Sequence, residues 1–153
     1  RICDPLGSKG SLKLHKCIND IINDGVCETE TTIPHLPKLR YDNTLFHKGK
    51  EILFEFHGIQ HDKHVIFFHD TLEKFQEARQ RDLIKRKIVD LFPNNYRYIS
   101  FSYHWAKRPM SDFHKRITTF LNSDEPYCID EHNEWLNDEP DENMYERIDW
   151  CDE

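Results

Sequence analysis

The sequence predicts an α/β domain in which helices cover a mixed sheet, with its elements in the order α-β-β-β-α-β-α. A two-residue turn signal, Lys48-Gly49, joins two runs of alternating apolar residues and predicts a hairpin. A long charged helix is followed by a strongly β-prone run at 96–103. Because a helix between two strands is the usual connection of parallel strands, the sheet is expected to be mixed.

The first predicted helix covers residues 11–24, where apolar residues recur at helical spacing and Asp24-Gly25 ends the segment. A threonine-rich strand follows at 26–33 and ends before Pro34. The hairpin strands are predicted at 39–46 and 51–57.

A polar, histidine-rich loop over 58–70 separates the hairpin from the long helix, which is predicted at 71–92. That helix is stopped by Pro93-Asn94-Asn95. The strand at 96–103 has apolar residues on both faces and is expected to be covered on both sides. A short helix at 111–121 closes the pattern.

The hairpin fixes which residues face each other. If Lys48-Gly49 is the turn, His47 lies opposite Lys50, and counting back along both strands places Asp42 opposite Glu55. Side chains directly opposite each other share a face of the sheet, so the two carboxylates are expected to meet. By alternation His57 joins that face, with Arg40 opposite it.

Charge divides the chain into two parts. Residues 122–153 hold thirteen acids and one base, whereas residues 1–121 hold fifteen acids and twenty bases. We therefore predict a mildly basic domain over 1–121 and an acidic C-terminal tail or docking arm over 122–153. The tail is expected to occupy a basic groove of the same chain, to bind a protein partner, or simply to keep the protein in solution.

Length and cysteine usage narrow the class of protein. At 153 residues the chain is long enough for one domain with its own core. Its five cysteines are widely spaced and form no CxxC pair, which favours a reducing compartment over a disulfide framework. With no apolar run of membrane-spanning length, we predict an intracellular protein, in cytoplasm or nucleus, of cellular, viral or phage origin.

Two carboxylates and a histidine on one sheet face suit phosphodiester hydrolysis. Asp42 and Glu55 are predicted to bind Mg²⁺ or Mn²⁺, because these ions prefer carboxylate oxygens. His57 or His61 is predicted to transfer protons near neutral pH. In the alternative interpretation Asp42 is a turn residue and Glu55 an exposed strand acid paired with Arg40.

The histidines between 57 and 69 also allow a zinc site, although no cysteines stand at ligand spacing nearby. On the long helix, Asp82 and Lys85 share a face, and Lys85 is expected to reach the site or to form an exposed ion pair. The surrounding arginines and lysines of that helix suit a nucleic-acid backbone or an ordinary solvated face. Trp105, in a polar stretch, is predicted to stack on bases.

Taken in order, several segments resemble the PD-(D/E)XK nuclease superfamily, and most closely very short patch repair endonucleases and EDxHD homing-type nucleases. The resemblance spans roughly residues 7–103 and rests on five segments of the sequence: Ser8-Lys9-Gly10, Leu39-Arg40-Tyr41-Asp42, Phe54-Glu55-Phe56-His57-Gly58-Ile59-Gln60-His61, Arg81-Asp82-Leu83-Ile84-Lys85 and the strand at 97–103. It implies a three-layer α/β/α restriction-endonuclease-like fold with a central mixed sheet and an endonuclease that cuts DNA, with RNA as the alternative substrate.

Carried over residue by residue, the resemblance implies that Asp42 and Glu55 are the metal ligands and that His57, His61 and Lys85 complete the catalytic site. The residues expected to contact nucleic acid are Arg40, Gln60, Arg81, Asp82, Lys85 and Trp105. The chain departs from the pattern at Ser11, where the subgroup has a first-helix glutamate. That departure supports an alternative function, a catalytically degenerate nuclease fold that binds nucleic acid or assembles with protein.

Overall fold

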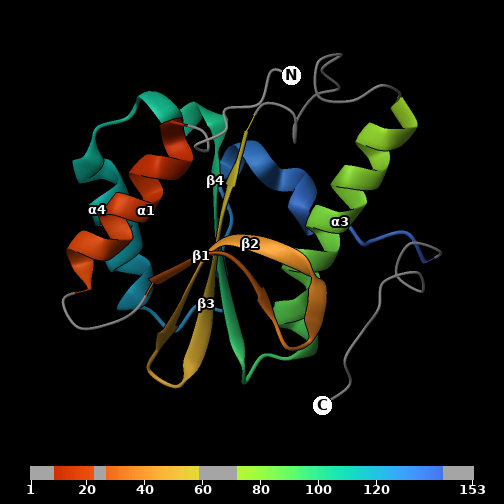
Figure 1. Ribbon diagram of the computed structural model, residues 1–153, viewed down its shortest axis with the longest axis horizontal. Helices are drawn as coiled ribbons and strands as arrows, with labels where there is room; N and C mark the ends of the chain where they lie inside the picture. Colours follow the sequence, from red (N-terminus) through yellow and green to blue (C-terminus); the bar gives the residue numbers. More distant parts are fainter. Residues whose placement is uncertain (1–8, 23–26, 59–71, 143–153) are drawn as a thin grey trace.

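The computed structural model describes residues 9–22, 27–58 and 72–142 and confirms the predicted α/β class (Figure 1). Helices lie on both sides of a five-stranded mixed sheet. The elements in chain order are α1 (Lys9–Ile21), β1 (Cys27–Ile33), β2 (Leu36–His47), β3 (Lys50–His57), α3 (Leu72–Leu91), β4 (Tyr96–Ser102), the 3-10 helix η1 (Tyr103–Lys107), α4 (Met110–Leu121), β5 (Tyr127–Cys128) and the 3-10 helix η2 (Glu131–Asn137).

The hairpin between β2 and β3 has the predicted turn and the predicted register. Lys48 and Gly49 have φ angles of 50° and 83°, and positive φ at both positions is what a two-residue type I′ turn requires. His47 lies opposite Lys50, and the pairing continues to Asn43 opposite Phe54. The turn alone therefore set the register of these two strands.

The sheet has the strand order β1-β2-β3-β4-β5. The first three strands are antiparallel neighbours, whereas β3–β4 and β4–β5 are parallel pairs. Each parallel pair is joined by a crossover that contains a helix, α3 for the first and α4 for the second. This arrangement brings β3 to the middle of the sheet, between β2 and β4.

Two separate apolar cores cover the two faces of β3. Ile52, Phe54 and Phe56 pack on the α1 and α4 side, while Leu53 packs on the α3 side. Gly10 of α1 lies against the Phe56 ring so closely that an added Cβ would be 2.0 Å from it. The alternation leaves Glu55 and His57 on the α3 side, together with Leu53.

Helix α3 buries a polar pair of residues within its apolar stripe. Asp82 and Arg86 are buried along with Phe75, Ile84 and Ile88. Leu72 and Leu91, the terminal residues of the helix, are exposed. Among the described helices, none combines the length and the apolar character needed to cross a membrane.

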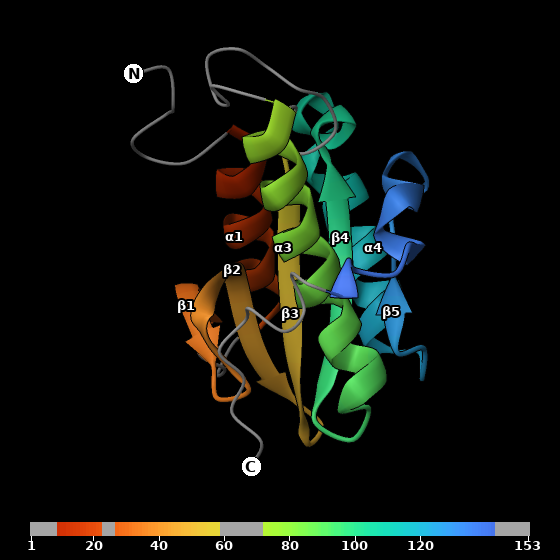
Figure 2. The same cartoon turned by 90° about the vertical axis from the view of Figure 1, so that its right-hand side faces the viewer.

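The acidic segment after residue 121 continues the domain. β5 adds a strand to the sheet beside β4 (Figure 2), and Leu136 of η2 is fully buried on the α3 side. The boundary between a domain over 1–121 and a tail or docking arm over 122–153 stays a prediction, and within that arm residues 127–137 pack on the sheet of the same chain. Apolar residues spaced among acids, such as Ile129 and Leu136, suffice to dock this segment on its own sheet.

A buried acidic cluster as the candidate functional site

Three carboxylates and one ammonium meet on the α3 side of the sheet. Asp42 comes from β2, Glu55 from β3, and Asp82 and Lys85 from successive turns of α3. Glu55 and Asp82 are only 3% and 4% exposed. All three carboxylates interact electrostatically with Lys85. We refer to Asp42, Glu55, Asp82 and Lys85 as the acidic cluster.

Lys85 and Glu55 form the centre of the acidic cluster. The Lys85 Nζ lies 2.5 Å from the Glu55 Oε1, and both side chains are largely removed from solvent. Lys85 also lies over the Tyr41 ring, 5.3 Å from its centroid. The sequence placed Lys85 near the site only through helical spacing with Asp82. Its ion pair with Glu55 depends on how α3 docks on the sheet.

The protonation of this pair follows from burial and from the excess of carboxylates. Burial raises the pKa of Glu55 well above its usual value; the Lys85 ammonium lowers it, and Asp42 and Asp82 raise it further. For Lys85 burial alone would lower the pKa, but the carboxylates, Glu55 foremost, raise it to about 12. Lys85 therefore stays positively charged at any physiological pH.

Asp42 lies at the point where the pairing of β2 with β3 ends. Its Oδ2 accepts a hydrogen bond from the Phe56 main-chain N at 2.7 Å. The paired residues of β2 and β3 end at Asn43 and Phe54, one position short of Asp42 and Glu55. Asp42 is half-buried there and lies near enough to Glu55 that its charge raises the pKa of Glu55.

Two tyrosines of the α3 side complete the surroundings of the acidic cluster. The Tyr41 hydroxyl donates a hydrogen bond to the Lys85 main-chain O at 2.8 Å. Tyr98 of β4 is fully buried and lies in the field of Glu55, Asp82 and Asp42. The sequence gave no sign of Tyr98 at this site, because the parallel register of β4 beside β3 is set by the crossover through α3.

His57 lies on the predicted face of the sheet, where η2 packs against it. It is fully buried, and its ring centroid lies 5.6 Å from that of Trp135 in η2. The Arg79 guanidinium of α3 lies 4.2 Å from the centroid of the same tryptophan. The acidic segment therefore separates this candidate proton-transfer residue from solvent.

Two predicted nucleic-acid contacts, Arg40 and Arg81, are exposed. Arg81 directly precedes Asp82 on α3. The pairing of β2 with β3 ends at Asn43 and Phe54, so the expected position of Arg40 opposite His57 lies beyond the paired residues. On its other side Arg40 pairs with Thr32 of β1.

Trp105 does not lie with the acidic cluster. It is 9% exposed and belongs to the core on the α1 and α4 side, the opposite face of the sheet. Its ring meets those of Phe101 and Phe113 edge to face, each at 5.3 Å between centroids. The structure gives it a packing role where the sequence predicted base stacking, because its polar neighbours along the chain hid its contacts with α4.

Other predicted site residues fall outside the described ranges, namely Gln60, His61, His64 and His69. The zinc hypothesis depended on these histidines. Within residues 9–22, 27–58 and 72–142, no group of three or more histidine, cysteine or carboxylate side chains has the geometry to hold a metal ion.

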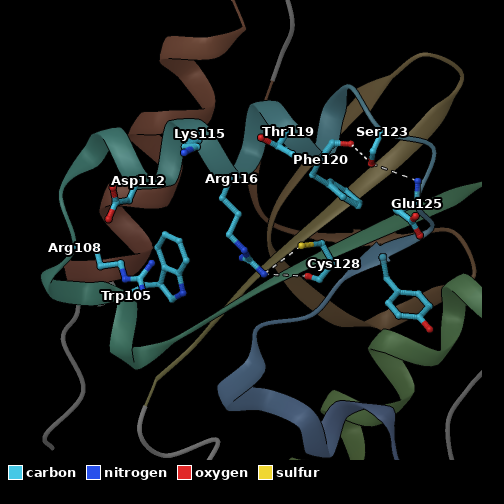
Figure 3. A pocket seen from close by; sticks show the side chains of 11 residues that line it. Trp105, Arg108, Asp112, Lys115, Arg116, Thr119, Phe120, Ser123, Glu125 and Cys128 are labelled. Atoms are coloured by element: carbon cyan, nitrogen blue, oxygen red, sulfur yellow. Dashed lines mark hydrogen bonds between the residues drawn. The ribbon is translucent and has the colours of Figure 1, made fainter.

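A groove lies between α4 and β5, and no residue of the acidic cluster lines it (Figure 3). It has a volume of about 620 Å³ and is lined by Trp105, Arg108, Asp112, Arg116, Tyr127 and Cys128, among others. Its two arginines are already engaged: Arg108 lies 4.2 Å from the Trp105 ring centroid, and Arg116 donates to the Ser100 and Cys128 main-chain oxygens. We therefore place the candidate chemistry at the acidic cluster and not at this groove.

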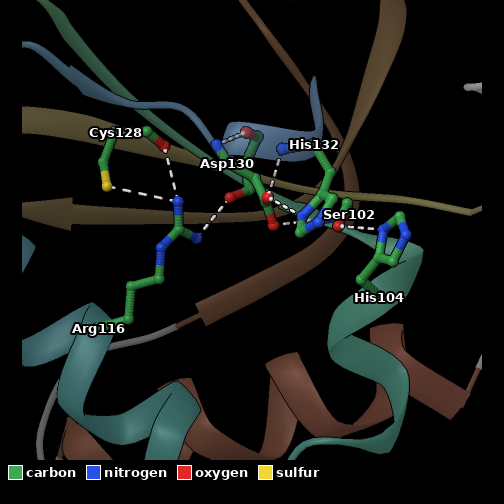
Figure 4. A network of polar contacts seen from close by, with 7 residues as sticks. Ser102, His104, Arg116, Cys128, Asp130 and His132 are labelled. Atoms are coloured by element: carbon green, nitrogen blue, oxygen red, sulfur yellow. Dashed lines mark hydrogen bonds and ion pairs between the residues drawn. The ribbon is translucent and has the colours of Figure 1, made fainter. Parts of the chain in front are cut away.

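Beside the groove, Asp130 ties the acidic segment to the sheet (Figure 4). Its Oδ2 accepts from Ser102 N at 2.9 Å, and its Oδ1 accepts from His132 N at 2.9 Å. Burial alone would raise the pKa of Asp130, but these hydrogen bonds, that of the His132 ring and the nearby Arg116 charge lower it. His104 stacks on the His132 ring at 3.9 Å.

Comparison of the chain with known proteins gives no template for the site. No family model, curated protein or solved structure matches the chain. The candidate site therefore stands on the contacts described above.

Proposed function

We propose that the protein is a metal-dependent nuclease that hydrolyses phosphodiester bonds in DNA at the acidic cluster. The observation that carries the proposal is the convergence of Asp42, Glu55 and Asp82, from three different elements, on the single ammonium of Lys85. Clusters of buried titratable side chains with shifted pKa values are typical of functional sites.

We propose Asp42 and Glu55 as the ligands of a divalent cation that keeps most of its waters, since the three carboxylates of the acidic cluster do not by themselves form a metal-binding group. Magnesium and manganese prefer carboxylate oxygens and retain several waters. The buried Tyr98 hydroxyl faces the same carboxylates and, among the described residues, has no hydrogen-bond partner, so it could serve one of those waters. When bound, such an ion polarises the scissile phosphate and lowers the pKa of a bound water.

Lys85 suits a role in charge stabilisation. Since its pKa is about 12, it cannot serve as a general base near neutral pH. Its ammonium, held in place by Glu55, would instead stabilise the negative charge that develops on the phosphate. Proton transfer then falls to His61 or to His57, since histidine is the side chain best suited to proton exchange near neutral pH.

DNA is the proposed partner, on the strength of the resemblance to very short patch repair endonucleases together with two exposed cations. Arg81 stands next to Asp82 on α3, and Arg40 stands on β2 two residues before Asp42. Cations on either side of a phosphate-binding centre would hold the flanking phosphates of a strand. Gln60 would add a contact from the loop that follows β3.

A second candidate is a nuclease fold that has lost catalysis and serves to bind or assemble. The acidic segment favours it, because that segment occupies the cations of α3: Glu139 lies 2.7 Å from Lys87, and Trp135 lies beneath Arg79. Ser11 also favours this second candidate, because it stands at the position of the glutamate that the resemblance implies. In this reading the Glu55–Lys85 pair only holds α3 on the sheet.

Cleavage of supercoiled plasmid DNA with Mg²⁺ or Mn²⁺ tests the two candidates. The nuclease proposal predicts metal-dependent nicking that falls at least about 100-fold in Asp42→Asn, since one ligand is lost. Asp112→Asn, in the groove on the other side of the molecule, is the matched control and should cleave as the wild type does. Wild-type protein that binds DNA without cleaving it would favour the assembly module.

A further inference from the structure

Basic side chains line a small pocket at the hairpin end of the sheet, and no residue of the acidic cluster belongs to it. The turn between β2 and β3, the start of β4 and the end of α4 form its walls. Figure 2 shows the turn and the start of β4 together at one end of the sheet. The charged and titratable lining residues are His47, Lys48, Lys50, Arg97 and Asp124. We refer to this cavity as the basic pocket.

Arg97 is the buried cation of the basic pocket, with only 7% of its surface exposed. Its Nε donates to the Glu125 main-chain O at 2.9 Å, and its Nη2 donates to the main-chain oxygens of Phe120 and Ser123 at 2.8 and 3.1 Å. Within the described residues Nη1 takes part in no hydrogen bond, and it is not sealed from solvent. Because a guanidinium carries five N–H donors, the Nη1 donors remain for a ligand in the pocket that Arg97 lines.

The other basic groups of the pocket come from the hairpin and have no counter-charge. Lys48 is the first turn residue, and His47 and Lys50 pair across the turn. Among the described residues, none of these three forms an ion pair. Burial, then the charges of Lys48 and Arg97, lower the pKa of His47. The field inside the basic pocket is therefore positive, and its imidazole is mostly neutral near pH 7.

The end of α4 would by itself disfavour an anion, because the last carbonyls of a helix carry partial negative charge. Here those carbonyls are already hydrogen-bonded. Phe120 O accepts from the Arg97 Nη2 and from the Ser123 hydroxyl, each at 2.8 Å, and Thr118 O accepts from Asn122 N at 3.0 Å. The negative end of the helix is thus met within the protein, and the donors of the basic pocket are not spent on it.

We propose that the basic pocket binds a phosphate group with two negative charges, either as inorganic phosphate or as the terminal phosphate of a phosphate ester. Its three cations and the Asp124 carboxylate leave an excess of two positive charges. Guanidinium and ammonium groups are the side chains best suited to phosphate oxygens.

The size of the pocket agrees with this ligand. The volume is about 170 Å³, and at about 30 Å³ for each water-sized group that is room for the five heavy atoms of a phosphate but not for a whole nucleotide. This site is separate from the acidic cluster and does not depend on the proposed nuclease function.

Titration of ¹⁵N-labelled protein with sodium phosphate tests the proposal by NMR. It is run at about pH 8, where phosphate is mostly a dianion, and is compared with sodium chloride at equal ionic strength. Phosphate should cause saturable shifts of the amides of Lys48, Gly49 and Arg97, and chloride should not. Equal shifts with both salts, or phosphate shifts centred elsewhere, would overturn the proposal.

The double variant Lys48→Asn/Lys50→Gln removes both hairpin ammoniums and keeps the turn, because Asn-Gly is a preferred pair for a type I′ turn. It should bind phosphate about tenfold more weakly, as expected for two exposed charge pairs, and should unfold at the wild-type temperature or above it. The matched control Lys107→Gln/Lys115→Gln removes two lysines outside the pocket and should bind as the wild type does. Wild-type affinity in the first variant would contradict a phosphate site at the hairpin.

The source of the phosphate group is distinguished by competition with a short DNA oligonucleotide that carries or lacks a 5′-phosphate. Displacement of inorganic phosphate by the phosphorylated form alone would assign the pocket to a nucleic-acid end. Displacement by neither form would assign it to free phosphate or a small phosphate ester. Equal displacement by both forms would contradict a pocket that is built for a terminal phosphate.

Discussion

Two groups of buried charges lie at different places on the same sheet and are satisfied in different ways. At the β5 edge, Arg116 donates to main-chain oxygens of Ser100 and Cys128, and Asp130 accepts from main-chain nitrogens of Ser102 and His132. In the acidic cluster the Glu55 carboxylate instead meets the Lys85 ammonium of another element, in the field of Asp42 and Asp82. Charges bonded to main chain hold strands and turns in place, whereas the Glu55–Lys85 pair joins a strand to a helix by side chains alone.

The comparison extends to neutral groups. The Ser100 hydroxyl, beside Asp130, accepts from the Asp130 main-chain N at 3.0 Å. The Tyr98 hydroxyl, two residues earlier on the same strand, has no partner within the described residues. One strand therefore contributes a satisfied polar group to the structural network and an unsatisfied one to the candidate site. Buried polar groups without a partner are rare in native proteins, so this hydroxyl sets the Tyr98 position apart from Ser100.

The largest expected effect comes from removing the ammonium at the centre of the acidic cluster. Lys85→Met should lower the free energy of unfolding by about 3–5 kcal/mol, because Glu55 would stay buried without a counter-charge. The double variant Glu55→Gln/Lys85→Met should recover much of that loss. Chemical denaturation of the three proteins measures the effect. A Lys85→Met protein as stable as the wild type would show that the pair is not coupled.

A smaller effect, with a distinct pH dependence, is expected at Asp130. Asp130→Asn should cost about 1.5–3 kcal/mol near pH 7, since the carboxylate accepts two main-chain hydrogen bonds. The pKa of Asp130 is lower in the native protein than in the unfolded chain, where it is about 4. Its contribution to the free energy of unfolding is therefore fully present above the unfolded pKa, and it is lost as the pH falls through the native pKa.

The charged and titratable groups around Asp130 are Arg116 from α4 and His132 from η2. The His104 ring stacks on the His132 ring. The comparison of Asp130→Asn with the wild type should therefore be made as a pH series of unfolding free energies. The difference between the two proteins should shrink towards acid pH. A difference that stays constant down to about pH 3 would contradict a charged Asp130. Mg²⁺ binding should be unchanged in this variant, since Asp130 lies outside the acidic cluster.

The smallest effect is expected where the acidic segment meets α3 at the surface. Glu139 lies 2.7 Å from Lys87, but its side chain is 75% exposed. Glu139→Gln should therefore change the free energy of unfolding by less than about 0.5 kcal/mol. A loss above about 1 kcal/mol, measured by urea denaturation at low salt, would mean that this ion pair anchors the segment.

Local signals in the sequence predicted the hairpin and the two carboxylates that it contributes to the candidate site, Asp42 and Glu55. The turn at Lys48-Gly49 fixes φ at two positions and thereby the register from His47 opposite Lys50 to Asn43 opposite Phe54, next to Asp42 and Glu55. Tyr98 could not be assigned in this way, because a parallel neighbour is placed by the packing of a whole helix. The register count could not place Arg40 either, because the pairing of β2 with β3 ends before that residue.

The acidic segment shows a different limit of sequence reasoning. Its charge suggested an arm outside the domain, yet Asp130 and Asn133 are buried within it. The charge of Asp130 is met by main-chain donors at the end of β4, which no local pattern reveals. Trp105 was misread for the opposite reason: its neighbours along the chain are polar, while its neighbours in space are the aromatic rings of the α4 side.

The most direct test of the central claim locates the bound ion. Mn²⁺, which is paramagnetic, should be titrated at low ratio into ¹⁵N-labelled protein while amide signals are followed by NMR. The account predicts selective broadening of the amides of Asp42, Phe56 and Asp82, while those of the α4–β5 groove, such as Arg116 and Cys128, stay sharp. Broadening centred on the groove or on the acidic segment, with the amides of the acidic cluster unaffected, would contradict it.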